Sequence, residues 1–74
     1  MTFDYSSLSG KIIEKYGNQY NFAKAMGLSE RSISLKLNGK VGWKQVEIAK
    51  AVEKLEIDIS EIPSYFFNLQ VQNN

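Results

Sequence analysis

Glycine residues divide most of this chain into short segments, and their spacing limits the fold more than any other feature of the sequence. Glycine is common directly after the last residue of a helix, because it tolerates the positive φ that many helix ends require. Between the glycines, apolar residues recur at the intervals of an amphipathic helix. The sequence therefore predicts a compact all-α fold of five short helices. The dividing glycines are Gly17, Gly27, Gly39 and Gly42.

Residues that cap helices mark the start of most of these segments. Asp4, Asn18 and Ser29 are the predicted N-caps of the first three helices, because their side-chain oxygens can accept hydrogen bonds from free N–H groups. Ser60 is expected to open the fifth helix, whose first turn tolerates Pro63. The first four helices are expected from Asp4 to Gly17 and at about residues 19–26, 30–37 and 44–55. The expected inward side chains are Tyr5, Leu8, Ile12, Tyr16, Phe22, Ala23, Met26, Ile33, Leu37, Ile48, Val52, Leu55, Ile62 and Phe66.

The residue composition excludes several classes of function. The chain has 74 residues and contains neither cysteine nor histidine. It therefore has no disulfide, no thiolate metal site and no side chain suited to general base catalysis near neutral pH. No nucleophile paired with a base and no phosphate-binding glycine pattern is present. We expect no enzyme, and no requirement for a metal, a cofactor or a small-molecule substrate.

The distribution of apolar residues indicates one soluble domain. The longest apolar run, residues 65–67, is far too short to cross a bilayer, and the N-terminus lacks the pattern of a secretory signal. We expect a cytoplasmic protein without a membrane partner. Residues 1–67 are expected to form the domain, and residues 68–74 either a short tail or a strand-like arm.

The most informative segment is residues 19–38, QYNFAKAMGLSERSISLKLN, which reads as two short helices joined by a tight turn at Gly27. Ala23 is small where two helices would cross closely, and Leu28 is apolar where the second helix would pack on the first. This arrangement resembles the helix-turn-helix of the lambda-repressor-like family, which includes the Cro and repressor proteins of phages. The resemblance covers about residues 5–62. It implies a DNA-binding domain, with the helix-turn-helix in helices two and three, that acts at the nucleoid of a bacterial host.

The third helix is the expected DNA-reading element. In a helix-turn-helix the second helix of the motif enters the major groove, and its first residues contact base edges. Arg31 suits a bidentate contact with guanine, Glu30 can accept from cytosine, and Leu35 can pack on thymine methyl groups. Glu30 can equally stabilise the helix N-terminus, and Leu35 can be an isolated exposed aliphatic residue. The base-reading positions implied by the resemblance are Ser29, Glu30, Arg31, Ser34 and Leu35.

Phosphate contacts are expected around the third helix, since such contacts position a protein on DNA without reading its sequence. Gln19 matches the glutamine with which the family binds phosphate. Lys24 is a looser candidate, and both it and Lys36 can equally be solvated surface residues. The expected phosphate-binding set is Gln19, Ser32, Lys36, Asn38, Lys40 and Lys44.

Lys36 is a departure from the family pattern, because it occupies a position that is usually a buried aliphatic residue. Ile33 and Leu37 define the inward direction of the third helix, and Leu35 lies opposite them. Lys36 flanks the core in this arrangement, so we expect its stem to pack there and its ammonium to reach outward.

The last part of the chain contains more apolar residues than one small core needs. We expect a homodimer, which would place two reading helices about one turn of DNA apart. Trp43 lies before the fourth helix and off its apolar stripe, where it either packs against the start of that helix or anchors a partner. The expected interface residues are Tyr65, Phe67, Leu69 and Val71.

The net charge of +1 is the sum of a basic part and an acidic part of the chain. Residues 18–45 contain five basic residues and one acidic residue, a net charge of +4, whereas residues 46–74 contain two and five, a net charge of −3. The basic part favours nucleic acid as a partner. Together with this charge, the resemblance implies a Cro-type regulator of a phage lysis–lysogeny switch, with double-stranded operator DNA as its partner. The acidic Glu30 and the weak overall basicity keep a second reading open. In that reading the protein is an antirepressor that binds the cognate phage repressor through the surface of helices two and three.

Overall fold

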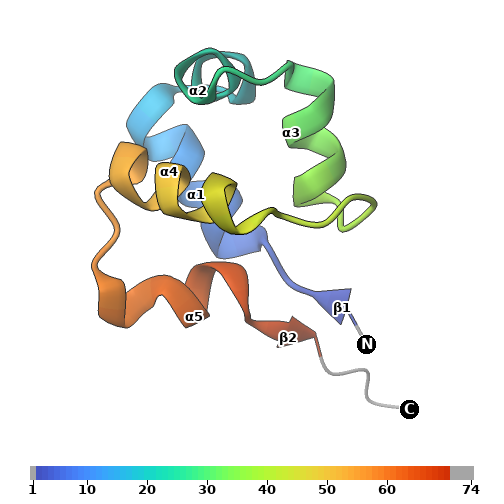
Figure 1. Ribbon diagram of the computed structural model, residues 1–74, viewed down its shortest axis with the longest axis vertical. Coiled ribbons are helices and arrows are strands. Elements are labelled where there is room, and N and C mark those ends of the chain that lie inside the picture. Colours follow the sequence, from blue (N-terminus) through green and yellow to red (C-terminus); the bar gives the residue numbers. More distant parts are fainter. Residues whose placement is uncertain (1, 71–74) are drawn as a thin grey trace.

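Five helices enclose one apolar core in the computed structural model, which describes residues 2–70. In Figure 1, α2 and α3 lie at the top and right, α4 crosses the front, and α5 closes the bottom. Leu8, Ile12, Phe22, Ile33 and Leu55 are fully buried, which confirms the all-α prediction and much of the predicted core. The elements are β1 (Thr2–Phe3), α1 (Ser6–Tyr16), α2 (Gln19–Met26), α3 (Glu30–Leu37), α4 (Gln45–Leu55), the 3₁₀ helix η1 (Ile59–Glu61), α5 (Ile62–Phe66) and β2 (Leu69–Gln70).

Two of the three predicted N-caps are confirmed. Asn18 Oδ1 accepts a hydrogen bond of 2.8 Å from the Asn21 N–H, and Ser29 Oγ accepts one from Ser32. The cap of α1 is different, because the backbone places Tyr5 at the N-cap position and Tyr5 makes no side-chain cap. Asp4 still accepts from the backbone N–H of Ser6 at 2.9 Å, and this bond lowers the pKa of its carboxyl.

The last helices differ from the sequence prediction. Ser60 does not open an α-helix but lies in η1, and α5 begins at Ile62 and has five residues. Pro63 accounts for this start, because a proline has no N–H to donate and is accommodated in the first turn of a helix. In α4 the inward side is shifted toward Ala51, which is fully buried, whereas Ile48 and Val52 are half-buried.

The two ends of the described chain form a small antiparallel pair of strands. Phe3 of β1 lies opposite Leu69 of β2, and the Asp4 N–H donates to the Asn68 carbonyl at 2.7 Å. Figure 1 shows both strands beside α5 at the lower right. Residues 69–70 therefore form the strand-like arm, while residues 71–74 lie outside the described part. Within residues 2–70 no helix is long and apolar enough to cross a membrane.

Candidate functional site

The helix-turn-helix is formed by α2, α3 and the turn between them. Gly27 ends α2 with φ of 72°, a left-handed conformation that glycine adopts without steric cost. The Leu28 N–H then donates to the Ala23 carbonyl at 2.9 Å, and Ala23 is almost completely buried. Lys50 of α4 fixes the same turn from outside, since its ammonium donates to the Met26 carbonyl. The turn therefore holds α3 at a defined angle to α2.

The first turn of α3 is its most exposed part. Ser29, Glu30 and Arg31 are exposed, while Ser34 and Leu35 are half-buried. Leu35 is thus not an isolated exposed side chain, and its carbonyl accepts from the Lys40 N–H at 2.9 Å. The sequence-predicted base-reading residues therefore form one continuous strip along α3, open to solvent at its N-terminal end.

The phosphate candidates differ in exposure. Gln19 is half-buried at the first position of α2, and Ser32 is half-buried on α3. The other candidates follow α3 and are exposed; they are Asn38, Lys40 and Lys44. The phosphate candidates thus come from the start of α2, from α3 itself and from the loop after its C-terminal end.

Lys36 does not belong to this exposed set. Its side chain is 4% exposed, and its ammonium lies 2.9 Å from Glu47 Oε1 and 3.2 Å from the Gly42 carbonyl. The ammonium also lies 6.0 Å from the centre of the Trp43 ring. The prediction that it reaches outward is wrong, and so is the phosphate contact assigned to it, because the start of α4 supplies an acidic partner on the inner side.

Glu47 completes this buried link between α3 and α4. Partial burial opposes its charged form, but hydrogen bonds from the Lys44 N–H, at 2.8 Å, and from Lys36 outweigh it and lower the pKa of the carboxyl. One carboxylate thus caps α4 and neutralises a lysine of α3. The sequence signal was a lysine at an aliphatic position followed by an acid in the first turn of the next helix.

Trp43 packs as part of the core. Its ring meets Phe66 edge-on at 5.3 Å between centroids and lies 6.4 Å from Tyr5. It stands directly before the N-cap of α4, which is the position of a residue that packs against the start of a helix. An apolar cavity of about 300 Å³ adjoins it, and Phe3, Val41 and other residues line the space. Trp43 therefore packs within the chain near the start of α4, as the first of the two interpretations of the sequence predicted.

The predicted dimer residues are unequally placed. Phe67 and Leu69 are 50% and 49% exposed, whereas Tyr65 is half-buried against the core. Val71 lies outside the described residues. Phe67 also meets Phe3 edge-on at 5.9 Å, so part of its apolar surface is already used within the chain.

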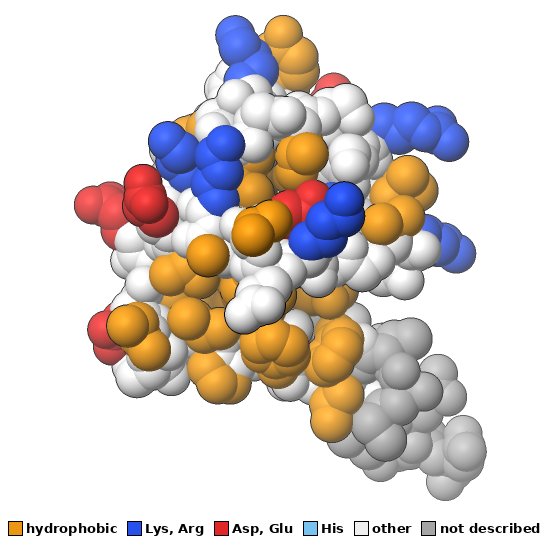
Figure 2. All heavy atoms as spheres, in the orientation of Figure 1, with side chains coloured by type: hydrophobic (Ala, Val, Ile, Leu, Met, Phe, Trp, Pro, Cys, Tyr) orange, Lys and Arg blue, Asp and Glu red, His pale blue; other side chains and the backbone are white. Residues whose placement is uncertain are grey.

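The charged side chains separate over the surface. In Figure 2 several lysine and arginine side chains project from the upper and right edges, over α2, α3 and the loop that follows. Acidic side chains gather at the left edge, beyond the end of α4, where a further group of basic side chains lies directly beside them. This arrangement follows the sequence, with basic residues concentrated in 18–45 and acidic residues after 46.

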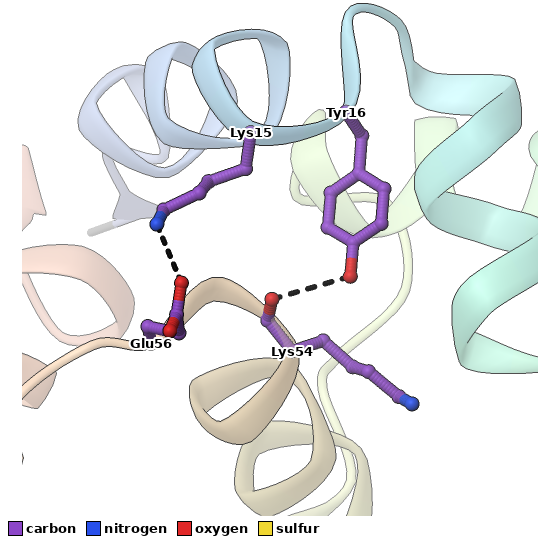
Figure 3. A network of polar contacts seen from close by, with 4 residues as sticks. All are labelled: Lys15, Tyr16, Lys54 and Glu56. Atoms are coloured by element: carbon purple, nitrogen blue, oxygen red, sulfur yellow. Dashed lines mark hydrogen bonds and ion pairs between the residues drawn. The ribbon is translucent and has the colours of Figure 1, made fainter.

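The end of α4 is tied to α1 by a second ion pair. Lys15 lies 2.7 Å from Glu56, and beside it the Tyr16 hydroxyl donates to the Lys54 carbonyl at 3.2 Å (Figure 3). The hydrogen bond raises the pKa of Lys15 and lowers that of Glu56. The Lys54 ammonium points away from Glu56 in the same view.

Residues 1–69 match the model of a protein family of unknown function, DUF739. The chain belongs to this family. Among solved structures, it is similar to the solution structure of the modulator of repression (MOR) of the temperate bacteriophage TP901-1 from Lactococcus lactis. The two sequences are 65% identical over 97% of each chain, with a TM-score of 0.79. No curated protein matches the chain. The likeness is to a small phage regulator, in agreement with the fold and with the modulator reading of the sequence.

Proposed function

We propose that this protein modulates repression in a phage by binding the cognate repressor protein and changing its binding to DNA. The observation that supports this most is the 65% identity, over nearly the whole chain, to a protein described as a modulator of repression. The simplest way for a domain of this size to change DNA binding is to cover the helix with which the repressor reads DNA. A bound protein at that helix excludes the operator without any chemical step.

The test is a competition on operator DNA. The cognate repressor is bound to its operator, and the protein is added in increasing amounts. We expect the repressor to bind this protein and the repressor–operator complex to change, either by release of the DNA or by a shift in its affinity. A repressor that neither binds the protein nor changes its operator affinity contradicts the proposal.

Direct DNA binding is a second candidate function, favoured by the exposed first turn of α3. Arg31 is exposed there, and residues 18–45 carry a net charge of +4. In this role α3 would read operator bases in the major groove, with Gln19, Lys40 and Lys44 on the backbone. A homodimer through Phe67 and neighbouring residues would match a pseudo-palindromic site.

This second candidate is tested with the operator region alone at two salt concentrations. Specific binding should weaken steeply with salt, because phosphate contacts release counterions. Arg31→Ala should weaken specific binding by about 1–3 kcal/mol if Arg31 contacts guanine. A Lys24→Ala control should leave the preference among sites unchanged. An Arg31→Ala variant with unchanged site preference excludes this role for Arg31.

A further inference from the structure

We propose that the repressor docks on the surface around η1, which we call the η1 surface, and not on the surface of α2 and α3. This inference rests on the proposed function and names the face of the molecule that performs it. The occupant is the positively charged, DNA-contacting face of a repressor. The η1 surface consists of the exposed residues Asp58, Ile59, Glu61 and Pro63.

The apolar centre of this surface is Ile59. Its side chain is 79% exposed, the highest fraction among the large apolar side chains that the structure describes. The backbone around it is held from within, because Ile57 before it is 6% exposed and Phe66 after it is 2% exposed. A firmly anchored, exposed isoleucine can enter a partner with little loss of conformational freedom.

Two carboxylates, those of Asp58 and Glu61, lie within two residues of this apolar centre along the chain, and both are exposed. Within residues 2–70 the ion pairs join Lys15 to Glu56 and Lys36 to Glu47, so Glu56 is neutralised. Asp58 and Glu61 have no such partner among the described residues, although Asp58 accepts a hydrogen bond from the Ser60 hydroxyl. In Figure 2 acidic and apolar side chains adjoin at the left and lower left of the molecule. The η1 surface therefore combines an apolar contact with uncompensated negative charge.

Charge complementarity selects the partner. A protein face that contacts DNA has to be basic, because it neutralises phosphates. The surface of α2, α3 and the loop that follows is basic even without the buried Lys36, and two basic faces repel each other. Its exposed charged residues are Lys24, Arg31, Lys40 and Lys44 against Glu30. The η1 surface has the opposite sign and attracts the same partner, as DNA does. Of the two candidate faces, the η1 surface fits the DNA-contacting face of a repressor.

The experiment measures the affinity for the cognate repressor by calorimetry with the full chain. The variant Ile59→Ala/Glu61→Gln should raise the Kd about tenfold or more, as loss of a central apolar anchor and a charge does at many interfaces. The matched control is Ile13→Ala/Glu14→Gln on α1, where Ile13 is 49% exposed and Glu14 is exposed. This control should change the Kd less than about twofold. Circular dichroism checks that both variants fold.

Two further measurements test whether the η1 surface binds the DNA-contacting face of the repressor. Asp58→Asn/Glu61→Gln should flatten the dependence of the Kd on salt, because it removes charge from the interface. Repressor already bound to its operator should fail to bind this protein, since the same repressor face is covered. A stable ternary complex of protein, repressor and operator overturns the assignment of that face.

These experiments test the docking surface and the proposed function separately. Wild-type binding that the η1 variant leaves unchanged overturns the docking surface, while the proposed function stands. Loss of binding in Arg31→Ala/Leu35→Ala with the η1 variant unaffected assigns docking to α3 instead. A wild-type chain that does not bind the repressor at all overturns both.

Discussion

Two ion pairs of similar length hold the two ends of α4, and they have different surroundings. At the N-terminal end Lys36 and Glu47 lie 2.9 Å apart, with side chains 4% and 12% exposed. At the C-terminal end Lys15 and Glu56 lie 2.7 Å apart, with side chains 32% and 74% exposed. The buried pair fixes α3, and the exposed pair fixes α1.

Burial, and not distance, decides what each pair contributes. Water screens the exposed pair, and the free side chains would be well solvated if separated. The buried charges have lost that water, so removing one partner leaves the other without compensation. The inner pair therefore holds α3 in place on the side of the molecule that contains the helix-turn-helix, while the outer pair leaves the neighbouring η1 surface free.

The largest loss of stability is expected for Lys36→Met. The variant keeps the apolar stem but leaves the Glu47 carboxylate largely buried without its cation. We expect the free energy of unfolding to fall by about 3–5 kcal/mol, measured by denaturant titration. Lys36→Met/Glu47→Leu, which removes both charges, should recover part of this loss. A double variant as unstable as the single variant would show that packing, and not the unpaired charge, causes the loss.

A smaller loss of stability, which depends on pH, is expected for Glu47→Gln. The amide keeps an acceptor for the Lys44 N–H but loses the charge, which should cost roughly 2 kcal/mol at pH 7. The pKa of Glu47 is lowered by folding, so its carboxylate stabilises the protein above the ordinary value of 4.5 and loses this effect as the pH falls through the lower folded pKa. The difference between variant and wild type should therefore shrink in acid. A constant difference from pH 7 to pH 3 contradicts this account.

Tyr16→Phe tests the hydrogen bond beside the exposed pair. The variant removes the hydroxyl that donates to the Lys54 carbonyl and keeps the ring, which packs 5.5 Å from Phe22 between centroids. We expect a loss of about 1 kcal/mol in thermal or chemical unfolding. No loss would mean that water replaces the tyrosine hydroxyl without cost.

Lys15→Met should have the smallest effect on stability and matches Lys36→Met in chemistry. Its partner Glu56 remains in water when the ammonium is removed. We expect a small change in the melting temperature that disappears in high salt, because screening already weakens the pair. A Lys15→Met loss as large as that of Lys36→Met would refute the role of burial.

Local sequence signals predicted the helices well and their ends less well. α2 and α3 have the predicted bounds, because Asn18, Gly27 and Ser29 act on groups within a few residues of themselves. The start of α5 was misplaced, since serine at position 60 and proline at position 63 give competing signals for a helix start. The strip of candidate residues on α3 was predictable from helical periodicity, which needs no knowledge of the neighbouring helices.

By itself, the sequence determined the order of five helices, the helix-turn-helix in residues 19–37 and the separation of basic from acidic residues. Each depends on interactions between residues close in the chain or on composition. The tertiary structure decided that Lys36 points inward and that Ile59 is exposed. The physical reason is that the burial of a side chain depends on which other segments fold against it, and periodicity along one helix does not contain that information.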